Sequence, residues 1–98
     1  MTSLDEQIRK LREQTEFTRY QFVAAEIATS STALDVAEHE LSVGNTVMAE
    51  REIEATRKGI QVAERFLPEV GDAHRAHLET KLADLQSALQ AVEQKLNR

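Results

Sequence analysis

The chain has 98 residues, of which 41% are hydrophobic, 4% aromatic and 30% charged, and its net charge is −5. It contains no cysteine, which excludes disulfides and thiolate metal sites. Acidic and basic residues alternate along the sequence without forming a basic stripe, so we expect no nucleic-acid partner. No apolar run approaches the ~20 residues that span a bilayer, and the N-terminus lacks the apolar core of a signal peptide. We therefore expect no membrane partner and a cytoplasmic location.

The first predicted helix covers about residues 3–43. The sequence of residues 3–6 is a capping box that starts it, and no glycine or proline follows until Gly44. Gly44 and Asn45 supply a left-handed stop and the N-cap of the next helix. Serine and threonine at residues 29–32 offer hydroxyls that compete for backbone carbonyls. We expect one continuous helix with a bend at that point.

A second helix is predicted at about residues 46–66 and a third at about 72–96. Pro68 opens the turn between them and should push Leu67 out of the α-helical region. Asp72 is the predicted N-cap of the third helix. Because both connections are short, neighbouring helices are expected to be antiparallel.

Each predicted helix carries a heptad seam, in which apolar or small residues recur at spacings of three and four and therefore lie on one stripe. The seams are Leu4, Ile8, Leu11, Thr15, Thr18, Phe22, Ala25, Thr29, Thr32 and Val36 in the first helix; Ala49, Ile53, Thr56, Ile60, Ala63 and Leu67 in the second; and Leu78, Leu82, Leu85, Leu89, Val92 and Leu96 in the third. This pattern predicts an all-α antiparallel three-helix bundle with an extended N-terminal helix and coiled-coil-like packing, forming a single helical domain over residues 1–98.

A second apolar stripe begins at Phe17 of the first helix, so the C-terminal half of this helix is expected to pack in the bundle. The third helix would span about 38 Å at ~1.5 Å per residue, too little to cover the first turns of the first helix. A narrow, uncovered seam on a helical arm is typical of association, although a frayed, solvated arm is the alternative. The predicted partner-binding residues are Leu4, Ile8, Leu11, Phe17 and Tyr20.

The three histidines are the best candidate metal ligands in the chain. His74 and His77 lie one helical turn apart, but the sequence has no Glu-x-x-His motif of the kind found in di-iron bundles. A solvated helix start explains this pair better than a metal site does. His39 follows Asp35 by four residues, a spacing that favours local helix pairing over a catalytic dyad. We predict no metal, cofactor or catalytic residues.

Threonines occupy seam positions where leucine or isoleucine would pack more tightly. Thr15, Thr18, Thr29 and Thr32 are expected to face Thr56 of the second helix. They would form either a slightly polar channel for a ligand or a small-residue layer that lets helices approach closely, and the layer is the favoured interpretation.

The segment from Gly44 to Ala49, followed by Ile53, resembles the turn between the two helices of a tetratricopeptide repeat. The resemblance covers about fifteen residues and departs from the pattern at Thr56, where alanine is usual. No second copy occurs, whereas such solenoids need about three repeats to bury their faces. We interpret the resemblance as the shared chemistry of helical hairpins, and we assign no family.

These patterns indicate a non-enzymatic helical module for protein–protein interaction and assembly, forming a homodimer through its N-terminal arm. Phosphate-binding loops and nucleophile motifs are absent from the sequence. One alternative is a bundle that binds a small ligand or a metal, through the threonine-lined seam or the pair His74 and His77. Another is a regulatory or chaperone subunit that becomes ordered on a partner.

Overall fold

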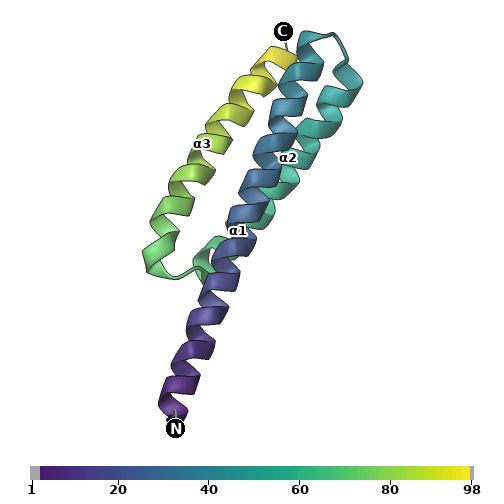
Figure 1. Cartoon of the computed structure of the whole chain (residues 1–98). Helices are drawn as coiled ribbons and strands as arrows, with labels where there is room; N and C mark the ends of the chain where they lie inside the picture. Colours follow the sequence, from purple (N-terminus) through teal and green to yellow (C-terminus); the bar gives the residue numbers. More distant parts are fainter. Residues whose placement is uncertain (1–2, 98) are drawn as a thin grey trace.

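The computed structural model describes residues 3–97, which contain three α-helices and no strand. The helices are α1 (Leu4–Ser42), α2 (Thr46–Phe66) and α3 (Asp72–Leu96), and a short 3-10 helix, η1 (Leu67–Glu69), precedes α3. They pack together into a thin bundle of 64 × 19 × 16 Å, with the N-terminal part of α1 projecting beyond α2 and α3 (Figure 1). The predicted all-α helical bundle is confirmed, and each helix ends within one residue of its predicted position.

The ends of α1 follow the capping chemistry expected from the sequence. The Ser3 hydroxyl accepts a hydrogen bond from the Glu6 amide at 3.2 Å. Gly44 has a φ of +80°, the left-handed conformation that glycine adopts without strain. The Asn45 side chain then accepts from the Met48 amide at 3.3 Å and begins α2. Through residues 29–32 α1 remains one continuous helix.

The second turn differs from the prediction in two respects. Leu67 keeps helical dihedrals (φ −55°, ψ −41°), because η1 holds it through a hydrogen bond from the Val70 amide to its carbonyl oxygen. Gly71, not Asp72, is the N-cap of α3, and no side chain caps this end. Instead, the Arg75 guanidinium donates to the Val70 carbonyl at 2.8 Å and so fixes the turn from within the helix.

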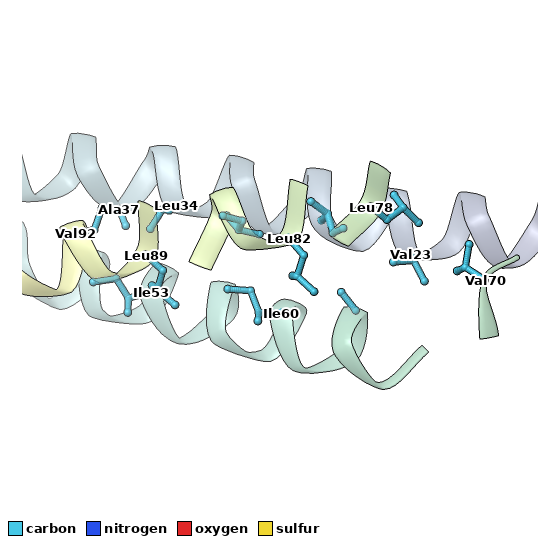
Figure 2. Close-up of a cluster of buried hydrophobic side chains, with 13 residues drawn as sticks. Val23, Leu34, Ala37, Ile53, Ile60, Val70, Leu78, Leu82, Leu89 and Val92 are labelled. Atoms are coloured by element: carbon cyan, nitrogen blue, oxygen red, sulfur yellow. The ribbon is translucent and has the colours of Figure 1, made fainter. Parts of the chain in front are cut away.

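The seams of α2 and α3 form one side of the hydrophobic core, as their spacing predicted. Ile53 of α2 and Leu78 and Val92 of α3 are among its most completely buried side chains (Figure 2). Val70, from the turn before α3, is also buried in it. The buried apolar residues that make up the core are Val23, Ile27, Leu34, Ala37, Ile53, Ile60, Ala63, Val70, Leu78, Leu82, Leu85, Leu89 and Val92.

The face that α1 turns toward the core is not the seam predicted from its sequence. The inner residues are Val23, Ile27, Ser30, Leu34 and Ala37, which are also spaced by three and four. They follow the predicted seam by one or two positions, and successive residues point about 100° apart around a helix. Along the bundle the predicted seam is mostly threonine and alanine, so it offers less apolar area to bury than the inner residues do.

The tightest approach between α1 and α2 lies at Ser30 and Gly59. A Cβ atom added to Gly59 would lie 1.7 Å from the Ser30 Oγ and 3.0 Å from its Cβ. Beside this crossing the buried Thr56 hydroxyl is 2.9 Å from the Glu52 carbonyl oxygen and 3.3 Å from that of Ser30. Thr56 therefore belongs to a small-residue layer that permits close helix packing.

The seam threonines of α1 do not take part in that layer. Thr15, Thr18, Thr29 and Thr32 are exposed, so the expectation that they face Thr56 is wrong. Three of them satisfy their hydroxyls locally, since Thr15, Thr18 and Thr32 each donate to the carbonyl four residues earlier. The reason is the rotation of α1, which turns a different stripe, with Val23, Ile27 and Ser30, toward the core.

Substituting Gly59→Ala tests the close crossing. Alanine stabilises a helix interior by about 1 kcal/mol relative to glycine, but forcing the helices apart costs about 1–3 kcal/mol. We expect a net loss in the free energy of unfolding, measured by urea denaturation.

The matched control is the same substitution in a Ser30→Gly background, where no side chain meets the new methyl group. There Gly59→Ala should stabilise the protein. If Gly59→Ala stabilised both backgrounds equally, the close crossing would be contradicted.

Candidate interaction surface

The arm, residues 4–12, is the part of α1 that extends beyond the rest of the bundle (Figure 1). Its large apolar side chains are exposed, at 69% for Leu4, 40% for Ile8 and 63% for Leu11. Asp5 and Glu6 in the first turn favour the helix by complementing its dipole. The arm is thus a helix whose apolar stripe has no partner within the described chain.

The beginning of α3 explains why the arm is uncovered. The Tyr20 and His74 rings lie 4.5 Å apart between centroids, which places the first turn of α3 beside the middle of α1. From there α3 runs toward the C-terminal end of α1, away from the arm (Figure 1). The lengths of the helices had already predicted that α3 would begin beside this part of α1.

We call the stripe Leu4 to Val36 the outer seam, and it continues from the arm onto the outside of the bundle. All of its positions are exposed, including Phe22 at 44%. The outer seam consists of Leu4, Ile8, Leu11, Thr15, Thr18, Phe22, Ala25, Thr29, Thr32 and Val36. It contains no charged residue, so a second apolar helix could lie along it without desolvating a charge.

The five residues predicted to bind a partner fall on two faces of α1. Leu4, Ile8 and Leu11 lie on the outer seam, whereas Phe17 and Tyr20 lie toward α3. The Phe17 ring stacks on Tyr20 with 6.3 Å between centroids. Tyr20, half-buried, in turn contacts His74, so these two aromatic residues support the junction between α1 and α3.

Phe22 is a candidate surface residue that the prediction of the site omitted. Its ring meets that of Phe66 edge to face at 5.3 Å, an arrangement that aromatic pairs favour. With Thr18, Arg19 and Glu69 these rings line a shallow, largely apolar hollow of about 330 Å³. The heptad spacing that links Leu11 to Phe22 was the signal that could have identified it.

A second hollow, of about 400 Å³, lies between α1 and α3. Ala24, Ala28 and Ala88 contribute to its lining, and charged side chains of both signs, Asp84 and Lys81 among them, lie around it. The mixed charges select no particular class of ligand.

One ion pair connects α2 to α3 on the surface of the bundle. The Arg57 guanidinium contacts the Glu93 carboxylate at 2.7 Å and that of Glu54 at 3.3 Å. The hydrogen bond to Glu93 is the main reason that the pKa of Arg57 is raised above its usual value. Because both side chains are partly exposed, the pair contributes little to stability.

The alternative metal site does not assemble among residues 3–97. His74 and His77 are both exposed, and no three histidine or carboxylate side chains gather where they could share a metal ion.

Within residues 3–97, no helix has the length and apolar character required to cross a membrane.

No protein-family model, curated protein or solved structure matches this chain. The exposed outer seam is therefore the main guide to its function.

Adding zinc tests the remaining metal-binding interpretation. Two imidazoles without a third ligand hold zinc weakly, so we expect an equimolar amount of zinc to leave the melting temperature unchanged. His74→Ala should behave like the unmodified protein, with His39→Ala as the matched control on another helix. A zinc-dependent rise in melting temperature that only His74→Ala removes would contradict this expectation.

Proposed function

We propose that this chain is a non-enzymatic assembly module that forms a homodimer by pairing the outer seams of two copies. The observation that supports the proposal is the continuous exposure of a regularly spaced apolar stripe from Leu4 to Val36. Each Å² of apolar surface removed from water stabilises an association by roughly 25 cal/mol. Covering this stripe would therefore contribute substantially to the free energy of dimerisation. The proposal assumes the cytoplasmic location expected from the sequence.

A second copy is the occupant that the pattern favours. Heptad spacing fits another helix with the same spacing, because knobs of one seam insert into holes of the other. A two-fold symmetric pair would use the same surface twice and close on itself, leaving no seam free for further growth. The inner face of α1 is already occupied by the core, whereas the outer seam is exposed along its length.

The shape of the molecule supports a binding role over a catalytic one. A bundle only 19 × 16 Å in cross-section leaves little depth for a concave site. The two hollows described above are shallow, whereas the outer seam is long and continuous.

Leu11→Glu tests whether the arm mediates self-association. Burying a leucine is worth about 1.5–3 kcal/mol, and a symmetric dimer loses two of them, so the dissociation constant should rise at least about 100-fold. Light scattering across a tenfold concentration range would measure the molar mass, and circular dichroism should show that helicity is retained.

The matched control is Lys10→Glu, which introduces the same side chain one residue away, off the outer seam. It should leave the dimer largely intact. A monomeric unmodified protein at every concentration would contradict the homodimer, and the seam would then be a site for a different protein.

Phe17→Glu tests the predicted extension of this surface beyond Leu11. Because the Phe17 ring lies toward α3, we expect the substitution to change the dissociation constant less than threefold, well below the effect of Leu11→Glu. It should instead lower the melting temperature by loosening the contact with Tyr20. An effect on dimerisation as large as that of Leu11→Glu would show that Phe17 is part of the interface.

A further inference from the structure

Side-chain size differs between the two ends of the outer seam. The arm carries Leu4, Ile8 and Leu11, whereas the part over the bundle is dominated by small residues such as Thr29 and Thr32. In a parallel, in-register pair each residue would meet its own copy, so large side chains would face large ones and small would face small. Close packing along two straight helices requires a more even match.

We infer that the two copies pair in antiparallel orientation, with the arm of each lying on the bundle of the other. This inference rests on the proposed homodimer and specifies its geometry. In this alignment Leu4 lies opposite Val36 of the second copy, and Leu11 lies opposite Thr29 of the second copy. Each large residue of the arm then meets a smaller one, and the whole outer seam of both copies is covered.

The charges beside the seam favour the same alignment. Residues on either side of a heptad seam lie opposite one another across a helix pair and select its orientation. In the antiparallel alignment Arg12 lies opposite Glu26 of the second copy, and symmetry repeats the pair. Arg12 is exposed and Glu26 half-buried, and neither takes part in an ion pair within residues 3–97.

A parallel alignment makes no such pair. It would place Arg12 opposite Gln7 and Glu26 opposite Gln21, so neither charge would meet an opposite one. The β-branched Ile8 at one seam position is also typical of parallel dimers. The residue types at single seam positions therefore suit both orientations. The orientations differ in which side chains face each other, and the antiparallel one matches them better in size and in charge.

Shifting the antiparallel alignment by one heptad introduces like charges on either side. Moving toward the arm places Asp5 opposite Glu26, and Arg12 opposite Arg19. Moving toward the bundle places Arg19 opposite Glu26 in place of Arg12, and it adds Asp5 opposite Glu40, a pair of like charges that is destabilising. The inferred alignment has one pair of like charges, the two Arg19 side chains, which face each other near the symmetry axis.

The hollow beside Phe22 lies close to that axis. In the antiparallel alignment Thr18 faces Phe22 of the second copy, next to the apolar hollow of about 330 Å³ that Phe22 and Phe66 line. Pairing would therefore cover the part of the Phe22 ring that Phe66 leaves exposed.

Reversing the flanking charges tests the orientation. Arg12→Glu would replace attraction by repulsion at two symmetric pairs, and Glu26→Arg would do the same. Since exposed pairs are worth up to about 1 kcal/mol each, either change should weaken the dimer about tenfold. The double substitution should return the dissociation constant to within about threefold of the original, as measured by analytical ultracentrifugation.

Gln14→Glu is the matched control. In the antiparallel dimer residue 14 lies opposite Ala28 of the second copy, so the substitution should have little effect. In a parallel dimer it would lie opposite Arg19 and strengthen the association. Tighter binding by this variant would overturn the inference.

A distance measurement supplies evidence that does not depend on folding energies. The chain has no cysteine, so Gln7→Cys can carry a single spin label. The two labels should be about 40 Å apart in the antiparallel dimer, given ~1.5 Å per residue, and about 20 Å apart in a parallel one. Electron paramagnetic resonance distinguishes these values.

The possible results separate this inference from the proposed function. A dimer whose dissociation constant the double substitution does not restore, or whose labels lie about 20 Å apart, overturns the antiparallel orientation. The homodimer itself would remain supported. A monomer at all concentrations overturns both. Coupled reversals with labels about 40 Å apart support both.

Discussion

The close approach of Ser30 to Gly59 sets the rotation of α1 about its own axis, and the exposure of the outer seam follows from that rotation. Only a glycine leaves room for the Ser30 side chain at this crossing. With Ser30 turned inward, Val23, Ile27 and Leu34 are carried into the core on the same face. The opposite side of the helix then faces solvent over its whole length. A different rotation would have buried the outer seam along the bundle.

This rotation leaves α1 with a second apolar stripe that the core does not use. The core uses one heptad stripe from each helix, and α1 possesses a second. Two heptad stripes on one helix are the arrangement expected of a helix with neighbours on two sides. One set of neighbours is α2 and α3, and the proposed second copy would be the other.

The arm and the bundle have complementary properties in this arrangement. The arm has large apolar side chains and nothing to pack against, whereas the outside of the bundle has small side chains on a rigid support. An arm that lies on another bundle would dock as a helix that is already formed, and the receiving surface would need little adjustment. Such pairing reduces the entropy lost on association, because the helix is already capped at Ser3.

Local rules in the sequence determined where α1 begins, where it ends and where α2 begins. Ser3, Gly44 and Asn45 act through their immediate neighbours, so their roles were readable without a fold. The seams of α2 and α3 were equally clear, because their apolar residues recur regularly at spacings of three and four. Likewise, the length of α3 was enough to show that the arm would be uncovered.

Only the tertiary structure decided which of the two stripes of α1 enters the core. Both have the same spacing, and the sequence offered Thr29 and Thr32 on one stripe against Ser30 and Leu34 on the other. The choice depends on Gly59, 29 residues beyond Ser30, because the absence of a side chain there lets the stripe that carries Ser30 pack closely against α2. Non-local packing of this kind leaves no periodic signal in a single helix. For the same reason the positions of Phe17, Tyr20 and Phe22 relative to the surface became apparent only once α3 and Phe66 were in place.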